Sequence, residues 1–575
     1  MKDDNVPRGP GRIKSNMPIS FEEATSQVCA PGTLFEIVET DIRGTLTKSF
    51  IGTPPNIRAL YQMASQRIDE FIIYEDERWT MPELLNLAGK IGNALVTQFE
   101  VEKGDRVAIA MRNYPEWIAA FAAITSIGAV AVPLNAWWES EELSFALEDS
   151  GSKIVFADNE RIDHLPKLAV ETGDLRIIGI RTGLNRKENI IPVEDILDPD
   201  ATMPEVSIAP DDNLTILYTS GTTGTPKGAV STHRAILSAL LAFSARAQIA
   251  EMMEPTERSD DQPLQTAFML CVPLFHVTGL IPIMLGSFVG GSKLVMTHKW
   301  KPDRALELIE KERVTHFIGV PTMSWDLLEE PTFALRDTSS LRSVGGGGAP
   351  MPPELVKRID ENFKKGRPGL GYGMTETNAY GPQNTGQEFL DHPTSTGRAV
   401  PIMELRVTDP DGNVLGPGET GELWFSGPTL ITEYWNRPDA SAETIVDGWL
   451  KSGDIGRIDE DGRIYVSDRV KDMVLRGGEN IYCAEVEAAI YEIGSVHECS
   501  VYGVPDERLG ERLACHIMVK SGMEIKKLEI VEFLQGKIAS FKIPEIITIV
   551  DRPLPRNASG KILKRELRED AIEGL

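Results

Sequence analysis

Short apolar runs alternate with longer apolar or amphipathic stretches through the first third of the chain. Three runs have strand length and are rich in β-branched and small apolar residues: 105–113, 129–135 and 153–158. Two stretches between them, 114–128 and 140–151, have helical length, and each ends at a glycine, a common stop signal for helices. Strands that alternate with helices predict a parallel sheet with right-handed crossovers and helices on both faces.

The pattern changes at both ends of the chain. Residues 1–30 are polar, contain proline and glycine, and predict a flexible extension. Residues from about 395 to 470 are rich in glycine, proline and aspartate, and their short apolar runs predict a β-rich lobe. From about residue 472 onward the pattern again predicts mixed α/β structure. Because 575 residues are too many for one compact core, several lobes are expected.

Composition narrows the classes of function. The chain has 59 lysine and arginine residues against 86 aspartate and glutamate residues, a net charge of −27, which argues against general nucleic-acid binding. One segment departs from this balance, because Arg552–Arg568 holds six cations and one anion and is a candidate strip for contact with an anion. Five scattered cysteines, without a CxxC pair, fit neither a disulfide framework nor a zinc site and indicate the reducing cytoplasm.

One uncharged stretch, Trp117–Leu134, is long enough to span a bilayer. Gly128 and Pro133 interrupt it, so it is better explained as a buried helix followed by a buried strand. The N-terminus lacks the apolar core of a secretory signal. We therefore expect no transmembrane segment. Peripheral contact with a membrane stays open, as does the choice between a monomer and a homodimer.

The strongest local signal is the segment LYTSGTTGTPKGAV, Leu217–Val230, which lies between a strand-like run and a helix-like run. Its glycines let the backbone turn tightly, and successive N–H groups and hydroxyls in such a loop form a concave anion site. The pattern differs from the GxxxxGK[ST] loop of P-loop NTPases. The residues expected to bind phosphate are Thr219, Ser220, Gly221, Thr222, Thr223, Gly224 and Lys227.

The run YTSGTTGTPKG resembles the phosphate-binding signature of the adenylate-forming superfamily, which includes acyl-CoA synthetases, aryl-CoA ligases, peptide-synthetase adenylation domains and firefly luciferase. Further segments in the same order extend the resemblance over roughly residues 55 to 570. It implies an α/β fold with a large N-terminal domain over 31–470, made of two doubly wound α/β lobes and the β-rich lobe. A small, mobile α+β C-terminal domain is expected over 471–575. The resemblance also implies that ATP and Mg²⁺ convert a carboxylic acid into an acyl-adenylate, whose acyl group passes to coenzyme A.

The segment GYGMTET, Gly371–Thr377, looks like the family's second nucleotide segment. The resemblance implies that Tyr372 lies against the adenine and that Thr375 contacts the phosphate and the acyl carboxylate. It also implies that Glu376 holds Mg²⁺, a cation that prefers oxygen ligands, with Thr222 as a second contact. The other nucleotide-binding residues expected in this segment are Gly371, Gly373 and Met374.

The run GGGGAP, Gly345–Pro350, stands where the family lines its adenine and acyl pockets with backbone, and its four glycines leave room for a larger acyl chain. In the resemblance His276, within PLFHVTG, gates the acyl pocket, although a lone histidine after phenylalanine is often a packed core residue. Val320, within GVPTM, is expected in another wall of that pocket, together with Gly346. The residues assigned to the nucleotide side are Gly347, Gly348, Ala349 and Pro350.

The longest matching stretch is Trp449–Glu487. Asp454 resembles the carboxylate that accepts both ribose hydroxyls, and Arg469 resembles a second nucleotide contact. Lys471 falls at the family's hinge, about which the small domain rotates between adenylation and thioester formation. The resemblance also implies that Gly477 and Gly478 lie at the strand edge past which the pantetheine arm of coenzyme A runs, because a side chain there would block it.

The segment LPRNASGKILKREL, Leu554–Leu567, matches the family's C-terminal lysine segment. Lys561 is therefore expected to reach the acyl carboxylate and the α-phosphate during adenylation only. The expected function is that of an ATP-dependent acid–CoA ligase for a medium- or long-chain fatty acid, without a nucleic-acid partner. The alternatives are an aryl or phenylpropanoid acid–CoA ligase and an acyl-AMP ligase that loads a carrier protein.

Overall fold

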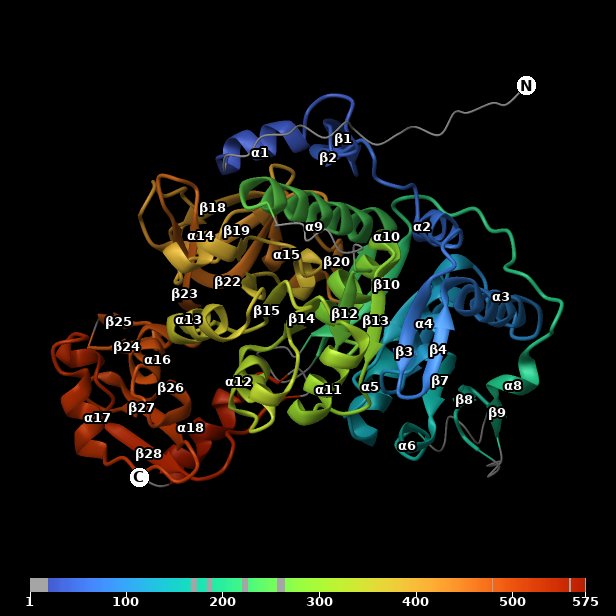
Figure 1. Cartoon of the computed structure of the whole chain (residues 1–575). Helices are drawn as coiled ribbons and strands as arrows, with labels where there is room; N and C mark the ends of the chain where they lie inside the picture. Colours follow the sequence, from blue (N-terminus) through green and yellow to red (C-terminus); the bar gives the residue numbers. More distant parts are fainter. Residues whose placement is uncertain are drawn as a thin grey trace.

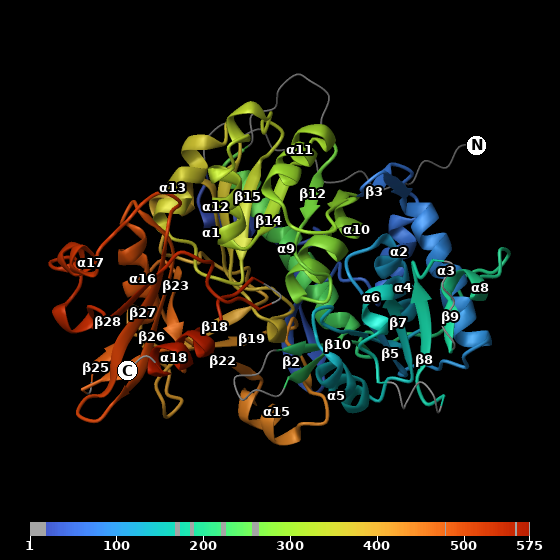
Figure 2. The ribbon, with the colours of Figure 1, turned by 90° about the horizontal axis from the view of Figure 1, so that it is seen from below.

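The computed structural model describes seven stretches of the chain: 19–166, 173–183, 189–219, 226–255, 264–477, 479–557 and 560–573. The large domain contains two eight-stranded sheets and a five-stranded sheet, and the small C-terminal domain is built on another five-stranded sheet. Figures 1 and 2 show the small domain at one end of the molecule, beside the β-rich part of the large domain.

The first eight-stranded sheet confirms the predicted alternation of strands and helices. In spatial order its strands are β20 (Glu433–Tyr434), β11 (Lys227–Thr232), β10 (Asn213–Thr219), β6 (Val130–Pro133), β5 (Arg106–Ala110), β7 (Ile154–Asp158), β8 (Arg176–Ile180) and β9 (Ile190–Pro192). Its crossover helices include α4 (Pro115–Ser126) and α5 (Ser140–Ser150). Strands β5, β6 and β7 pair in parallel. Gly128 and Gly151, which follow the two helices, both have positive φ, as their role as stop signals requires.

The second eight-stranded sheet forms one wall of the candidate active site described below. In spatial order its strands are β17 (Gln383–Thr385), β16 (Arg367–Gly371), β15 (Ser343–Gly347), β14 (His316–Gly319), β12 (Ala267–Leu270), β13 (Lys293–Met296), β3 (Glu70–Tyr74) and β4 (Glu77–Thr80). The helices of this region include η1 (Gly279–Leu285), α10 (Gly286–Gly290), α11 (Pro302–Glu312), α12 (Pro321–Glu329), α13 (Pro353–Asn362) and α14 (Gly386–Asp391). Strands β14, β15 and β16 are parallel, and β17 closes this edge in antiparallel pairing.

The phosphate segment lies between two antiparallel strands, β10 and β11, whereas the sequence predicted a strand before it and a helix after it. Helix α9 (His233–Met253) begins only after β11, and the side chain of Thr232 caps it by accepting a hydrogen bond from the backbone N–H of Ala235. Strand β11 is buried from Gly228 onward. It therefore has no alternation of polar and apolar residues that would identify it as a strand.

Helix α9 is the one described helix that is long and apolar enough to cross a membrane by length and composition. It packs against β11, η1 and α10, and more than half of its residues are buried within the protein. Its apolar character follows from this central position. The uncharged stretch 117–134, in turn, is the buried helix α4 followed by the buried strand β6, as predicted.

The predicted flexible extension ends earlier than residue 30. Helix α1 (Phe21–Val28) packs on the outer side of α9, with Phe21 and Ala24 buried. Ser20 caps the helix by accepting a hydrogen bond from the N–H of Glu23. The sequence analysis was therefore wrong for residues 21–28, because one apolar face on an eight-residue helix is a weak signal in a polar segment.

The β-rich sheet and the small domain complete the molecule. The strands of the β-rich sheet are β18 (Glu404–Thr408), β19 (Gly421–Ser426), β21 (Ile445–Val446), β22 (Trp449–Ile458) and β23 (Ile464–Arg469). The elements of the small domain are β24 (Val474–Arg476), β25 (Glu479–Ile481), α16 (Cys483–Tyr491), β26 (Val496–Asp506), β27 (Gly510–Val519), α17 (Lys527–Leu534), β28 (Ile546–Val550) and α18 (Lys564–Glu573). The small domain has its own apolar core between α16, α17 and this sheet.

Candidate active site

A cleft of about 2690 Å³ lies between the large domain and the small domain. Residues of both eight-stranded sheets, of the β-rich sheet and of the small domain line it. The predicted residues among them are Thr219, Lys227, His276, Val320, Gly346, Gly347, Gly348, Gly371, Gly373, Met374, Thr375, Glu376, Arg469 and Lys561. The structure thus brings most of the predicted segments to one cavity.

Asp454 is buried beside this cleft, between an aromatic hydroxyl and a guanidinium. The Tyr372 hydroxyl donates a hydrogen bond of 2.5 Å to Oδ2 of Asp454, and Nε of Arg469 lies 3.4 Å from Oδ1. Asp454 and Arg469 are opposite each other on β22 and β23. Burial raises the pKa of Asp454, while Arg469 and the Tyr372 hydroxyl oppose that rise. Burial beside this carboxylate also raises the pKa of Tyr372 well above its usual range.

Tyr434 connects two of the predicted site residues, Glu376 and Lys227. Its hydroxyl donates a hydrogen bond of 2.6 Å to Oε1 of Glu376, and Nζ of Lys227 lies 5.2 Å from the centre of its ring. Burial and the neighbouring Glu376 carboxylate raise the pKa of Tyr434. Sequence analysis missed this residue, because Tyr434 lies far from both motifs and only the pairing of β20 with β11 brings it to them.

Asn378 fixes the turn that carries Glu376. Its φ is 55°, a left-handed conformation that asparagine tolerates better than most residues. Its buried side chain donates a hydrogen bond of 2.8 Å to the carbonyl of Thr429 and accepts one of 2.9 Å from the hydroxyl of Ser231 on β11. Strand β11 and the turn with Glu376 are therefore held together. An asparagine after the TET run is a recognisable turn signal, but nothing in the sequence identifies its partners.

The residues present fit a Mg²⁺ ion held largely by substrate oxygens. Within the described part of the chain there is no group of three or more histidine, cysteine, aspartate or glutamate residues that could hold a metal ion. Mg²⁺ commonly takes only one or two protein carboxylates, together with phosphate oxygens and waters. Glu376 lines the cleft, and among the described contacts only its Oε1 is engaged, by Tyr434. It is therefore a suitable single carboxylate ligand.

Lys561 enters the cleft from the small domain, next to Ile562, which forms a β-bridge with Arg556. Its backbone N–H donates a hydrogen bond of 2.9 Å to Oδ1 of Asn557. Burial, and next the charge of Arg469, lower the pKa of Lys561 to about 8. Burial, with a further contribution from Lys561, lowers the pKa of His276 to about 4, so His276 is neutral at pH 7. Lys561 is thus close to Arg469, which was predicted on the nucleotide side, and to His276, which was predicted on the acyl side.

Other predicted residues lie elsewhere. Among the described residues, Ala349, Pro350 and Gly477 do not line the cleft. Gly477 has a φ of 61° between β24 and β25, and its N–H donates to the carbonyl of Leu509 at 2.7 Å. Lys471 contributes to lowering the pKa of Lys561. The predicted residues outside the described stretches are Ser220, Gly221, Thr222, Thr223, Gly224 and Gly478.

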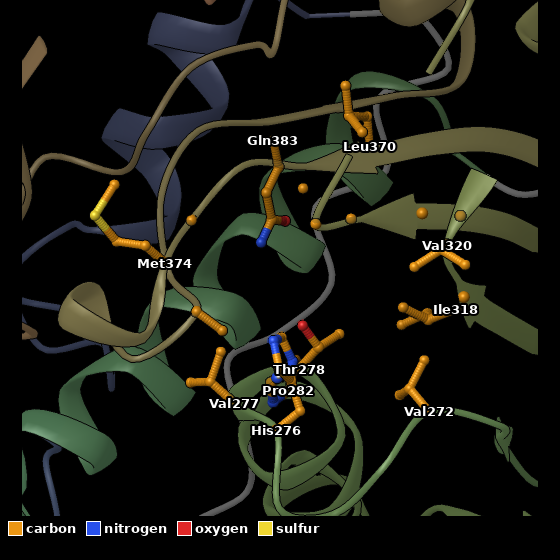
Figure 3. Close-up of a pocket in the computed structure, with 18 of the residues that line it drawn as sticks. Val272, His276, Val277, Thr278, Pro282, Ile318, Val320, Leu370, Met374 and Gln383 are labelled. Carbon is orange, nitrogen blue, oxygen red and sulfur yellow. Dashed lines mark hydrogen bonds between the residues drawn. The ribbon is translucent and has the colours of Figure 1, made fainter. Parts of the chain in front are cut away.

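The expected acyl side of the cleft is shown in Figure 3. Val272, Ile318 and Val320 form an apolar group on one side. His276 and Thr278 lie on the segment that leads into η1, and Gln383 on β17 points toward the space between them and the sheet. The residues predicted to line the acyl pocket are therefore part of a wider wall that includes several side chains the motifs did not identify.

Helix α12 of the large domain contacts the small domain through Glu329 and Trp325. Nδ1 of His497 lies 3.1 Å from Oε2 of Glu329, and Nζ of Lys520 lies 3.8 Å from Oε1. Nζ of Lys520 also lies 5.8 Å from the ring centre of Trp325. The Glu329 carboxylate raises the pKa of His497. These contacts link β26, and Lys520 directly after β27, to the end of α12.

Comparisons with known proteins agree with this geometry. The family model "AMP-binding enzyme" matches residues 60–435, and "AMP-binding enzyme C-terminal domain" matches 485–561. The long-chain-fatty-acid–CoA ligase FadD13 of Mycobacterium tuberculosis is 34% identical over 86% of this chain and 93% of its own length. A feruloyl-CoA synthase of Amycolatopsis sp is 34% identical over 85% and 93%. The structure of o-succinylbenzoate CoA synthetase (MenE) from Bacillus subtilis, with the acyl-adenylate intermediate OSB-AMP, is 30% identical, covering 90% of this chain and 98% of its own, with a TM-score of 0.75.

Proposed function

The chain belongs to the AMP-binding enzyme family, and we propose that it is an AMP-forming acid–CoA ligase for an elongated, largely apolar carboxylic acid. In the first half-reaction the carboxylate attacks the α-phosphate of ATP, which gives an acyl-adenylate and pyrophosphate. In the second, the thiol of coenzyme A attacks the acyl carbon, which gives a thioester and AMP. The relatives reported above are named for reactions of this type.

One observation carries this proposal: Lys561 of the small domain shares a cleft with Lys227 and Glu376 of the large domain. The first half-reaction must bring two anions together, a carboxylate and a phosphate. Two unit charges about 4 Å apart repel by roughly 1 kcal/mol in water, and by more where water is excluded. Cations that are already in place offset this repulsion without reorganising during the reaction. Lys227 and Lys561 supply two such cations from opposite sides of the cleft.

We assign the nucleotide to the side of the cleft next to Asp454. A carboxylate accepts only, and each of its oxygens has more than one lone pair, so Asp454 can accept two ribose hydroxyls while it keeps Tyr372 and Arg469 as neighbours. The buried hydrogen bond from Tyr372 holds the carboxylate in one orientation. We assign Glu376 as the carboxylate that holds Mg²⁺, an ion that when bound neutralises charge on the phosphates.

The second half-reaction requires room for the thiol. Lys561 lies on the small domain, so rotation of that domain about Lys471 would withdraw its charge once the adenylate has formed. The glycine turn at Gly477 would then be able to approach the cleft. In this proposal one flexible lysine serves the first half-reaction and is absent from the second.

The acid itself is assigned from the wall of the cleft. Val272, Val277, Ile318 and Val320 give the acyl side apolar surface, and Gly345 and Gly347 keep the adjoining sheet free of side chains. This apolar wall and the space beside the glycines favour an acid with a long carbon skeleton over a short acid. An aromatic acid is the second candidate, because one relative is named for feruloyl-CoA and another for long-chain fatty acids.

Acid-dependent exchange of labelled pyrophosphate into ATP, followed by thioester formation with added coenzyme A, tests the function. We expect both activities with a panel of elongated acids and Mg²⁺. Exchange without a thioester would replace the CoA ligase assignment by a ligase that loads a carrier protein. The absence of exchange with every acid would contradict the proposed function altogether.

A further inference from the structure

The second sheet turns one face toward the acyl side of the cleft, and the strand register identifies the residues of that face. Paired residues on neighbouring strands point to the same side of a sheet, and successive residues alternate. Starting from the pairs Gly371–Gln383 and Gly369–Thr385, the register assigns one set of residues to this face. All of them line the cleft: His316, Ile318, Ser343, Gly345, Gly347, Arg367, Gly369, Gly371, Gln383 and Thr385.

This face has a floor of four glycines bordered by polar side chains. A Cβ atom added at Gly371 would meet nothing within 4 Å, so the space beside Gln383 is open. Thr385 lies one row deeper on the same strand, about 6.6 Å away at the usual rise of a strand. Ser343, His316 and Arg367 form the next row. Polar groups therefore recur along the length of the floor, which is not what a plain hydrocarbon chain requires.

The polar atoms of three of these side chains are free to meet a ligand. Among the residues that the structure describes, the Gln383 amide and the hydroxyls of Thr385 and Ser343 have no hydrogen-bond partner. Figure 3 shows the Gln383 side chain directed into the cavity, toward Thr278 and Pro282. The hydroxyl of Thr278 likewise has no partner among the described residues. A donor and an acceptor on Gln383 thus face a cavity that Val272, Val277 and Ile318 also line.

The backbone of Gln383 is held firmly although its side chain is free. Nη2 of Arg246 donates a hydrogen bond of 3.1 Å to its carbonyl, and its N–H donates one of 3.2 Å to the carbonyl of Arg398. Gly397 packs so closely on the same carbonyl that no Cβ would fit there. The centre of the Phe21 ring lies 5.4 Å from the guanidinium of Arg246 and 5.0 Å from that of Arg398. Such support is typical of a binding residue whose position matters.

We propose that Gln383 and Thr385 determine specificity for an oxygenated acid, one that carries hydroxyl or oxo groups along its body, in preference to an unsubstituted chain of the same length. This inference rests on the proposed function. A plain chain would displace water from the Gln383 amide without replacing its hydrogen bonds, whereas a hydroxyl or oxo group restores them. Sites built to hydrogen-bond a substrate group discriminate strongly against analogues that lack it, because their own polar groups are left unpaired.

The test compares pairs of acids of equal length, each a saturated straight-chain acid and its mid-chain hydroxy or oxo analogue. We expect the wild-type kcat/KM for pyrophosphate exchange to favour at least one oxygenated member by about 10-fold or more. Gln383→Leu should remove most of that preference, and Thr385→Val should lower it for groups placed deeper on the chain. Gln387→Leu is the matched control, since Gln387 is exposed, its side-chain amide donates to Asp391 on its own helix, and its backbone N–H, which the substitution keeps, donates to Glu254.

The ratio between paired acids is an internal measure, so a general loss of stability in a variant does not affect it. A wild-type ratio near one, or one that favours plain chains, overturns the inference while leaving the proposed function in place. A Gln383→Leu ratio equal to that of the wild type also overturns it. If no acid supports exchange at all, the proposed function itself fails, and the two failures are therefore distinguishable.

Discussion

Lys561 is a cation in surroundings that oppose its charge. Burial and the nearby Arg469 lower its pKa to about 8, while Asp472 and Asp454 act in the opposite direction. The arrangement costs stability when the cleft is empty, which is typical of a group positioned for an anionic ligand. A carboxylate and a phosphate in the cleft would supply the missing negative charge.

Replacement of Lys561 by alanine tests its assignment to one half-reaction. We expect Lys561→Ala to lower acid-dependent pyrophosphate exchange by roughly 100-fold or more, because a cation positioned at developing charge is lost. Thioester formation from supplied acyl-adenylate and coenzyme A should change by only a few fold. Equal losses in both half-reactions would show that the lysine does not act in adenylation alone. Lys564 on α18, which pairs with Glu487 within the small domain, offers a control position.

The same lysine predicts an alkaline limit. Its lowered pKa means that Lys561 is charged below about pH 8 and neutral above it. The kcat/KM of adenylation, which reports ionisations of the free enzyme, should therefore fall as the pH rises through about 8. The arginine of Lys561→Arg stays charged throughout this range, so the activity of this variant should not fall as the pH rises through about 8. A wild-type profile that is flat across this range would contradict the assignment.

Asp454 provides a separate test of the nucleotide side. Asp454→Ala should raise the KM for ATP by about 10-fold or more, because two hydrogen bonds to a charged group are lost. Tyr372→Phe removes only the bond that orients the carboxylate, and a smaller rise is expected. Glu460→Ala, on an exposed turn of the same sheet, is the control. An unchanged ATP requirement in Asp454→Ala would remove the ribose assignment.

At the scale of elements, the sequence predicted those helices and strands that a local pattern of apolar and polar residues determines. The α4–β6–α5 region was predicted because its apolar runs have distinct lengths and both helices stop at glycines. Strand β11 and helix α1 were missed for different reasons. Burial on both faces removes the alternation from β11, and α1 is stabilised by packing on α9, which lies more than 200 residues away in the sequence. Tertiary contacts, not local pattern, specify these two elements.

Helix α12 suggests a test of how the small domain is held. Glu329 accepts from His497 and lies near Lys520, both of the small domain, and also near Arg358 of its own domain. Glu329→Gln should weaken this docking by about 1 kcal/mol, which corresponds to a fall of about fivefold in adenylation if the docked pose is required. Thioester formation, which uses another pose, should not fall.

The neighbouring Glu330→Gln is the matched control for this variant. In the described contacts, the Glu330 carboxylate accepts only from the backbone N–H and the hydroxyl of Thr332, on its own turn. Equal effects of the two variants on exchange would show that the charge near α12, and not the contact between the domains, is responsible. A loss confined to thioester formation would show that the docked pose serves thioester formation and not adenylation.

At the scale of the whole molecule, the motifs predicted the separate parts of the site better than their connections. Lys227, Glu376 and Lys561 were identified from three distant segments, and they line one cleft. Tyr434, which joins the first two, and Gln383, which faces the acyl side, were not identified. Each acts through a strand pairing or a register that links remote parts of the chain, and no short pattern encodes such a contact.

The division of labour between the two domains depends on rotation at Lys471, and a proline at this position tests it. Proline fixes φ near −65° and removes the N–H, and in the described contacts the N–H of Lys471 donates no hydrogen bond. If the adenylation pose tolerates that φ, Lys471→Pro should retain pyrophosphate exchange and lose thioester formation by about 10-fold or more. Lys471→Ala loses the same side chain but keeps the backbone free, so CoA transfer should persist. Wild-type transfer from supplied acyl-adenylate in Lys471→Pro would mean that the domain pivots elsewhere, and that Lys561 leaves the cleft by another movement.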